Sequence, residues 1–447
     1  MKFNKWTAGL AALGVVSLAS AAYADEQMSQ VQTALSQTTL SGYVDTAMQW
    51  SPGTDQSAGS AGVANKPTYS FAKNDGFSLN AVDIALDKPE DSSAWAAGYH
   101  VELMFGANSE PGINFTGNAT AANSGFGSIR QAFIRLHTPV GGNGIDWQIG
   151  VFDSIIGYES NSDPLNPNYT RSYGYTIEPT TFTGILGTYK VNDSLSFSAG
   201  VANMWNDNFA QVGYGVKAYQ GLNTTAFEES QKAYMGAINL TAPDSAGFLK
   251  GATVTLGVVH GVNSTIAGGS ETSWYAGATL PTPVNVLKVG AAFDYLMEAQ
   301  QSAVITPAGP IVPGTITRTG VTGGDDIWTL GLYATIQATD KLSLNVRGEY
   351  FDDGSHAFAY NSGTTGAPIP TLTSFDAVAL YPGNKGEEFT ATVQYNLWAN
   401  VMTRGEFRWD HVEHTFGNLE GFGANQSTGA IDKSNDFLLA LNVIYQF

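Results

Sequence analysis

The sequence predicts an all-β protein, a transmembrane antiparallel up-and-down β-barrel of about sixteen strands with short periplasmic turns and long external loops. Three observations predict it. The closing segment 437–447 alternates apolar with smaller or polar side chains and ends on an aromatic residue, Phe447. A period of two is typical of a strand, and such a strand at the carboxyl terminus is typical of outer-membrane barrels. Similar segments recur along the chain, and the connections between them alternate in length.

The amino terminus predicts export. Lys2 and Lys5 precede a short apolar stretch, 6–20, and Ala22-Tyr23-Ala24 forms an A-x-A cleavage pattern. These features indicate a cleaved secretory signal peptide over residues 1–24. The alternative, a retained membrane helix, is disfavoured because the apolar stretch is too short and has the wrong flanks.

Residues 25–38 are predicted to form a short amino-terminal helix or linker before the barrel, which is predicted to take residues 39–447. Met28, Val31 and Leu35 recur at helical spacing among polar residues. A periplasmic helix, a plug in the pore and a disordered segment all fit this pattern.

The composition excludes several classes of protein. The 447 residues include no cysteine, so neither disulfides nor thiol chemistry are expected. The formal net charge of −19 argues against nucleic acid as a partner. Charged residues make up only 13% and aromatic residues 12%, which is unlike a disordered chain.

Sixteen segments alternate, and most approach the length of about 9–11 residues that a tilted strand needs to cross a bilayer. In the clearest, Trp95, Val101 and Phe105 oppose His100 and Glu102. The predicted strands are 39–50, 77–87, 95–106, 128–138, 145–152, 182–190, 194–204, 231–240, 250–260, 271–280, 286–296, 326–337, 341–352, 388–397, 401–411 and 437–447.

Connection lengths support the barrel over its alternative, a large soluble β-sandwich or β-helix. Short turns are expected around 141–144, 191–193, 339–340 and 398–400. The long external loops are expected at 51–76, 107–127, 153–181, 205–230, 297–325, 353–387 and 412–436, and 261–270 is brief. Soluble β folds do not require this alternation of short and long connections.

A barrel of about sixteen strands leaves an aqueous channel, so its inner face should be polar. On 401–411, Arg404, Glu406, Arg408 and Asp410 share one face, and an Arg on the lipid face near the midplane would cost about 2–4 kcal/mol. The predicted inner acids are Asp45, Asp83, Asp87, Glu102, Asp146, Asp294, Glu349, Glu406 and Asp410, and the predicted inner bases are His100, Arg135, Lys288, Arg347, Arg404 and Arg408.

These charges have two interpretations. In the first, neighbours on the wall neutralise one another and keep the lumen wet. In the second, the acids of the first five strands face the bases from residue 286 onward, and the resulting transverse field selects solutes, with a mild preference for cations.

The third external loop, 153–181, is rich in charged and aromatic residues. Long loops without secondary structure of their own are usually functional or disordered. By analogy with sixteen-stranded porins, whose third loop narrows the pore, Glu159, Asp163, Arg171 and Glu178 are predicted to form the constriction. The alternative is a loop packed over the top of the barrel.

Five short motifs, taken in order, resemble the OmpL-like class of outer-membrane β-barrel porins over nearly the whole mature chain. They are Ser41-Gly42-Tyr43-Val44-Asp45, Phe77-Ser78-Leu79-Asn80, Gly157-Tyr158-Glu159, Tyr169-Thr170-Arg171-Ser172-Tyr173 and Arg347-Gly348-Glu349-Tyr350-Phe351-Asp352-Asp353. The resemblance implies a porin without catalytic residues. The family's Pro-Phe-Thr-His-Thr-Gly pattern is replaced here by Pro179-Thr180-Thr181-Phe182-Thr183-Gly184, which lacks the histidine.

Enzyme and metal functions find little support. None of the six histidines lies beside a Gly-x-Ser-x-Gly elbow. His411 and Glu413 point to one side of their strand and Asp410 and His414 to the other, so this group does not predict a metal site. No cofactor is expected.

The predicted function is therefore that of an outer-membrane porin for passive diffusion of small hydrophilic solutes or ions. A solute-specific channel, for example for sugars, and a non-transport adhesin or structural barrel are the alternatives. Expected partners are outer-membrane lipid, the solutes and the barrel-assembly machinery. A second copy of the chain could bind at the outer face of 182–190, which carries few bulky residues. Phe447 is predicted to be both a periplasmic girdle residue and, by resemblance to outer-membrane proteins, part of the assembly signal.

Overall fold

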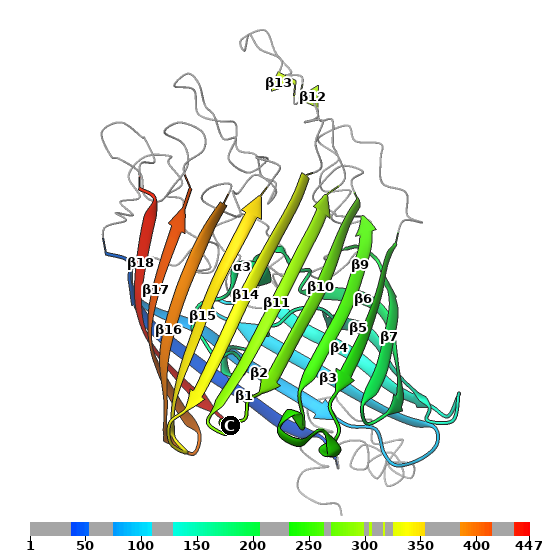
Figure 1. Cartoon of the computed structure of the whole chain (residues 1–447). Coiled ribbons are helices and arrows are strands. Elements are labelled where there is room, and N and C mark those ends of the chain that lie inside the picture. Colours follow the sequence, from blue (N-terminus) through cyan, green and yellow to red (C-terminus); the bar gives the residue numbers. More distant parts are fainter. Residues whose placement is uncertain are drawn as a thin grey trace, which may run out of the picture.

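The computed structural model describes residues 37–52, 75–109, 128–205, 232–262, 270–298, 304–305, 316–317, 325–353, 385–413 and 433–447. Sixteen strands form one closed antiparallel barrel (Figure 1). They are β1 (Thr39–Trp50), β2 (Gly76–Lys88), β3 (Ala96–Phe105), β4 (Ser128–Thr138), β5 (Ile145–Asp153), β6 (Thr181–Asn192), β7 (Leu195–Ala202), β8 (Ala233–Thr241), β9 (Thr253–Val262), β10 (Ser270–Pro281), β11 (Leu287–Glu298), β14 (Asp325–Gln337), β15 (Leu342–Asp353), β16 (Lys385–Trp398), β17 (Val401–Val412) and β18 (Asn435–Gln446). The predicted fold class is confirmed, and each strand overlaps a predicted segment.

A few further elements are short. β12 (Val304–Ile305) and β13 (Ile316–Thr317) pair with each other between β11 and β14, and two residues are too few to produce a readable alternation. Among the residues that the structure describes, the helices are η3 (Asp163–Leu165), α3 (Tyr173–Ile177) and η5 (Asp244–Leu249). Within the described ranges, every helix is too short or too polar to cross a membrane.

The last strand shows why the pattern gives a barrel wall. Leu439, Leu441 and Val443 are outward and exposed, whereas Leu438 and Asn442 are inward and buried. Successive side chains of a strand point to opposite faces, so the apolar row meets lipid while the other row meets the interior.

The barrel closes between its first and last strands. β1 pairs with β18 from Tyr43 opposite Gln446 to Trp50 opposite Leu439. Beyond this register, the backbones of Gly42 and Phe447 exchange two hydrogen bonds of 3.1 and 3.0 Å. A Cβ on Gly42 would lie 2.1 Å from the Asp83 carbonyl oxygen, so this close approach requires glycine. The closed order leaves no free edge in the sheet of the barrel.

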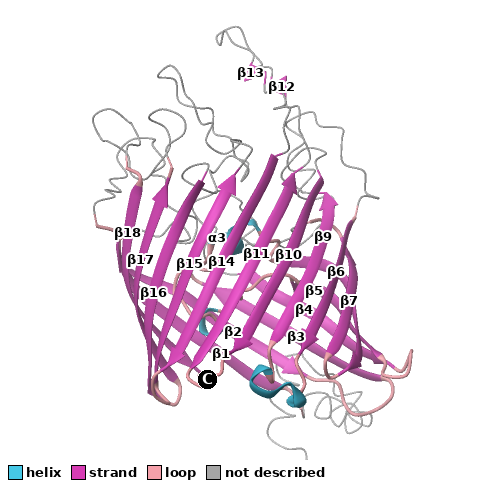
Figure 2. Ribbon diagram, viewed as in Figure 1, coloured by secondary structure: helices cyan, strands magenta, loops and turns pink. Residues whose placement is uncertain are grey.

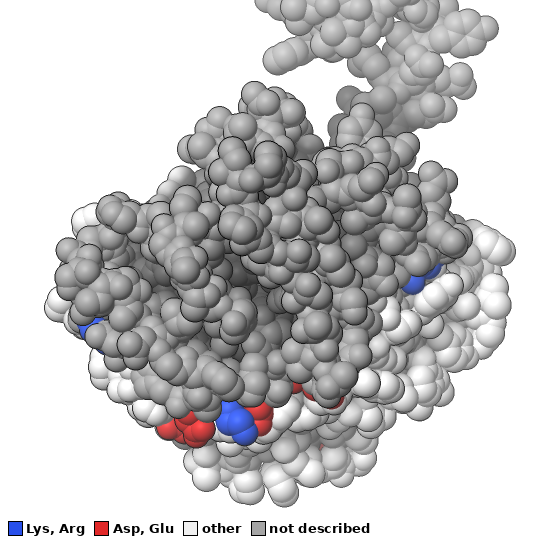
Figure 3. Space-filling model, turned by 90° about the horizontal axis from the view of Figure 1, so that it is seen from above, with Lys and Arg blue, Asp and Glu red and all other residues white. Residues whose placement is uncertain are grey.

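The two ends of the barrel differ. The short turns and the carboxyl terminus lie together at the lower end in Figure 1, and the strand ends that flank each long predicted loop lie at the other end. Seen from that upper end, small groups of described charged side chains are visible near the rim (Figure 3). The predicted signal peptide 1–24 and nearly all of 25–38 lie outside the described residues.

Candidate functional site

The connection between β5 and β6, residues 154–180, lies inside the barrel. It carries η3 and α3, and α3 contacts β11 and β14 on the far wall. The Ser172 hydroxyl caps α3 by accepting a hydrogen bond of 3.0 Å from the Tyr175 backbone N–H. Figure 2 shows α3 within the barrel outline, behind the front strands. This connection, hereafter the inner loop, therefore occupies part of the interior.

Arg404 on β17 binds the backbone of the inner loop. Its guanidinium donates to the carbonyl oxygens of Asp163, Asn166 and Asn168 at 3.2, 3.0 and 2.9 Å. Its Nε donates to Asn442 Oδ1 on β18 at 2.9 Å. The side chain is 1% exposed, so these acceptors take the place of water around a permanent charge.

Two further arginines bind the next part of the loop in the same way. Arg347 on β15 donates to the carbonyl oxygens of Thr170 and Arg171 at 2.9 and 3.1 Å. Arg408 on β17 donates to the Arg171 carbonyl oxygen at 2.6 Å. Both arginine side chains are 0% exposed.

Acidic side chains of the same wall bind the loop's backbone N–H groups. Glu406 on β17 accepts hydrogen bonds from the N–H groups of Tyr169 and Thr170 at 2.6 and 2.9 Å. Glu349 on β15 accepts one from Tyr173 at 2.8 Å. Wall cations thus bind loop carbonyls and wall anions bind loop amides, which fixes the path of the backbone.

Ion pairs neutralise Arg347 and Arg408. Arg347 lies 2.6 Å from a carboxylate oxygen of Glu159 in the loop and 2.8 Å from one of Glu388 on β16. Arg408 lies 2.7 Å from an oxygen of Asp410. Burying a charge is costly unless it is paired and hydrogen-bonded, and each of these arginines is both.

A second set of contacts, around Asp163, joins the loop to β1 and to the residue Asn108 after β3. Arg171 donates to the Asp163 carboxylate at 2.7 Å, and its guanidinium lies 5.4 Å from the centre of the Tyr175 ring. Asn108, which follows β3, donates to the same carboxylate at 2.8 Å. The Asp163 backbone N–H donates to the Tyr43 hydroxyl at 3.2 Å.

Two glycines make room for a pair of buried carboxyl groups, Glu178 and Asp294. Gly157 has φ +119°, and a Cβ there would lie 2.4 Å from Glu178 Oε2. A Cβ on Gly174 would lie 2.6 Å from Asp294 Oδ2. Burial, together with the nearby Asp294 carboxylate, raises the pKa of Glu178 well above its usual range.

The wall formed by β2 to β5 carries a separate row of charges. Arg130 lies 2.5 Å from Glu102 and 2.8 Å from Asp153, and Arg135 lies 2.6 Å from Asp87. The side chains of Arg135, Asp87 and Asp153 are 25%, 28% and 34% exposed. This wall, hereafter the charged wall, therefore remains accessible to water and ions.

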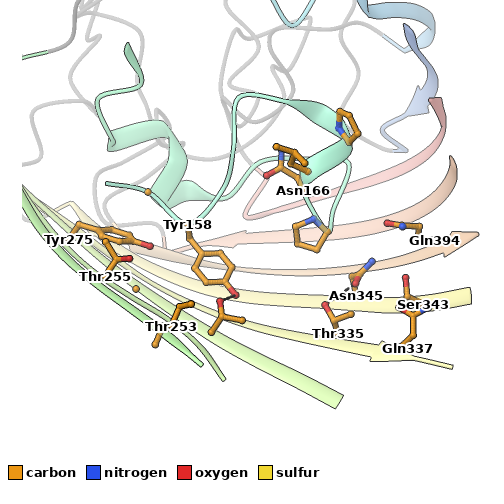
Figure 4. A pocket seen from close by; sticks show the side chains of 17 residues that line it. Tyr158, Asn166, Thr253, Thr255, Tyr275, Thr335, Gln337, Ser343, Asn345 and Gln394 are labelled. Carbon is orange, nitrogen blue, oxygen red and sulfur yellow. Dashed lines mark hydrogen bonds between the residues drawn. The ribbon is translucent and has the colours of Figure 1, made fainter. Parts of the chain in front are cut away.

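Below the inner loop, toward the short turns, lies a cavity of about 530 Å³. Its floor consists of hydroxyl and amide side chains from β9, β10, β14, β15 and β16, among them Thr253, Thr279, Thr335, Asn345 and Gln394 (Figure 4). Its roof consists of loop residues, including Tyr158 and the segment 164–167.

Most of the predicted site residues meet where the inner loop contacts the wall. These are Glu159, Asp163, Arg171, Arg347, Glu349, Arg404, Glu406 and Arg408. Asp45 is linked to them because the Asn442 amide contacts Asp45 and accepts from Arg404. Glu178 lies beside Asp294, and Glu102 and Arg135 lie on the charged wall.

The loop residues predicted for the constriction are buried against the wall, each at most 9% exposed. The arginines expected to face acids across open water, Arg347, Arg404 and Arg408, are likewise covered by the loop. Arg347 and Arg408 pair with carboxylates, whereas Arg404 donates to carbonyl oxygens and to Asn442. Their geometry is that of anchors, because the loop packs on the wall that carries them. A direct effect of these side chains on solute selection stays a prediction.

Sequence reasoning missed Arg130 and Asn108. Strict alternation from Arg135 points Arg130 toward lipid, but a β-bulge opposite Glu102 and Leu103 shifts the register and turns it inward. Nothing in the local sequence indicates this bulge, so the pairing of Arg130 with Glu102 and Asp153 was not predicted. Asn108 lies beyond the end of β3, where alternation carries no information.

Comparisons with known proteins agree with this architecture. The sequence profile of the family described as "Putative beta-barrel porin-2, OmpL-like" matches residues 37–447. No curated protein matches the chain in sequence.

Three solved structures are similar to the chain in fold. An anion-selective porin from Comamonas acidovorans has a TM-score of 0.52 and 12% identity, over 92% of this chain and 99% of that chain. The outer membrane channel DcaP of Acinetobacter baumannii has a TM-score of 0.52 and 10% identity, over 92% and 97%. The trimer form of OmpT from Vibrio cholerae has a TM-score of 0.50 and 12% identity, over 92% and 99%. With the profile match over nearly the whole barrel, the chain belongs to the OmpL-like family of outer-membrane β-barrel porins.

Proposed function

We propose that this porin is a passive diffusion channel in which the inner loop is a fixed partition that narrows the water-filled barrel. The observation that supports this most is the binding of the loop's backbone by Arg347, Arg404 and Arg408. Contacts to main-chain carbonyl and amide groups hold a loop in place independently of the loop's own side chains.

The open passage runs between the inner loop and the charged wall. The side chains that hold the loop are nearly devoid of exposed surface, whereas Asp146 and Asp153 on β5 are 40% and 34% exposed. Ions crossing the barrel therefore meet the charged wall. Its accessible carboxylates support a mild preference for cations, as a charged, low-dielectric passage concentrates counter-ions.

The amino-terminal pattern and the closing strand support export and assembly in the outer membrane. The signal peptide 1–24 would be removed on export, the outward apolar rows would contact outer-membrane lipid, and the barrel-assembly machinery would read Phe447. The trimer form of OmpT from Vibrio cholerae, together with the outer face of β6, supports a homo-oligomer.

Reconstituted channels test this function. In liposome swelling assays, small neutral and charged solutes should enter at rates that fall as solute size rises. In bilayers under a potassium chloride gradient, the reversal potential should show that potassium permeates more readily than chloride. This difference should grow at low salt, because the screening of the wall charges weakens. Asp146→Asn with Asp153→Asn should reduce that preference, with Thr188→Val on β6 as the control. Absence of both swelling and current would contradict the proposal.

A further inference from the structure

The cavity below the inner loop has a lining without charged side chains. All of its lining residues are neutral, and the polar ones are threonine, serine, asparagine, glutamine and tyrosine. Lys288, the register partner of Thr335, lies outside this lining. The charged wall of the same barrel, by contrast, presents acidic and basic side chains. A small ion therefore meets no opposite charge in the lining, whereas a neutral polar solute can exchange water for protein hydrogen bonds.

Hydrogen bonds orient the polar groups of the floor. Thr335 donates to Asn345 Oδ1 at 2.9 Å, so the lone pairs of its hydroxyl oxygen can accept from a solute. Thr279 donates to the Tyr158 hydroxyl at 3.1 Å, which leaves the Tyr158 proton to donate. The floor and the roof together thus offer acceptors and a donor to one ligand.

Most of the roof of the cavity is apolar, although Tyr158 and Asn166 also line it. Pro164, Leu165 and Pro167 line it, and Leu165 is 74% exposed although it lies within the barrel. The Tyr158 ring stacks on Tyr333 at 4.1 Å between centroids, which fixes its position. An apolar roof facing a hydroxyl and amide floor matches a sugar ring, whose C–H face is apolar and whose edge carries hydroxyl groups.

We propose that this cavity is a binding subsite for neutral saccharides of one to three units, on the periplasmic side of the inner loop. The proposal rests on the proposed diffusion function and names a solute class for it. The volume of about 530 Å³ lies within the range of about 300–1,000 Å³ typical of small-molecule sites. Weak binding suits a channel, because a solute must also leave.

Single-channel current in planar bilayers tests the subsite. Glucose, maltose and maltotriose are added to the periplasmic side of the purified channel, and polyethylene glycol of matched hydrodynamic size is the control. The saccharides should reduce the current in a saturable manner, whereas the polymer should reduce it linearly with concentration. Thr253→Val and Thr335→Val should each raise the half-blocking saccharide concentration about 2- to 10-fold, as expected for one lost hydrogen bond.

The matched control is Thr188→Val, which removes an inward hydroxyl on β6, bonded to Ser198 at 2.9 Å and outside the cavity lining. It should leave the half-blocking concentration unchanged. A conducting channel that saccharide and polymer affect equally would overturn the subsite alone. An equal shift in all three variants would also overturn it. Absence of ion conductance would overturn the diffusion function and the subsite together.

Discussion

At the residue scale, the defining feature is a buried arginine that binds main-chain oxygen atoms. Arg404→Gln would leave the carbonyls of Asp163, Asn166 and Asn168 short of donors in a buried position. Removing one partner of a buried charged contact costs about 3–5 kcal/mol, so the free energy of unfolding should fall by that order. Urea titration of the refolded protein in detergent measures it.

Arg135→Gln is the control for this substitution. Arg135 has one ion pair, to Asp87, and is 25% exposed, so its loss should cost less than about 1 kcal/mol. Equal destabilisation by both substitutions would refute the anchoring role of Arg404.

Glu178 adds a pH dependence. Its pKa is raised by burial and by the Asp294 carboxylate, so the folded state favours the protonated form. The stability that this group contributes is fully present below its ordinary pKa of 4.5 and is lost as the pH rises through the folded-state value. Glu178→Gln, which cannot ionise, should show a smaller loss of stability between pH 4 and pH 9. Denaturant midpoints across that range measure it, and an unchanged pH slope would contradict the assignment.

At the element scale, the inner loop depends on a glycine at a tight position. Gly157→Ala would strain a residue with φ +119° and place a Cβ 2.4 Å from Glu178. Overpacking of this kind costs about 1–3 kcal/mol, so the loop should shift and the single-channel current should become noisier.

Gly142→Ala is a matched control, because Gly142 has φ +93° and its Cβ would meet nothing within 4 Å. It carries the backbone strain without the collision. Equally noisy currents from both variants would show that backbone strain, rather than the Glu178 contact, is responsible.

A substitution at Phe447, the residue after the final strand, should affect assembly of the barrel without affecting its stability. Phe447→Ala retains the backbone hydrogen bonds to Gly42 but removes the terminal aromatic ring. If the assembly machinery reads that ring, the amount of barrel in the outer membrane should fall several-fold, while the purified, refolded barrel keeps its stability. Heat-modifiable gel mobility measures both quantities. Loss of stability with normal membrane levels would contradict the assembly role.

The strands were predictable from the sequence because each has its own period of two, as in β18. The contacts of the inner loop were not. The Tyr173 hydroxyl bonds to Asp410, 237 positions along the chain, and no local pattern encodes such a distance. Alternation placed Arg347 and Arg408 inward, yet it could not show that a loop would cover them. The direction of the Arg130 side chain was not predicted for a related reason, since one extra residue in a strand reverses every face beyond it.

At the scale of the whole molecule, the interior is divided into three regions. One wall, from β15 to β18, is occupied by the backbone contacts of the inner loop. The charged wall stays accessible beside it, and the neutral cavity lies below. Under the loop, neighbouring charges pair with one another, as in the first interpretation of the lumen charges. Accessible carboxylates remain on the charged wall, and the selection of solutes by a transverse field stays a prediction.

The most direct test is the single-channel conductance of the wild-type channel against the double variant Arg347→Gln with Arg404→Gln, compared with Arg135→Gln. If anchored backbone sets the width of the passage, the wild-type and Arg135→Gln channels should show steady conductance steps and the same size limit for neutral polymers. The double variant should show larger, fluctuating steps and admit larger neutral polymers. A double variant with wild-type conductance and the wild-type size limit would contradict the central claim.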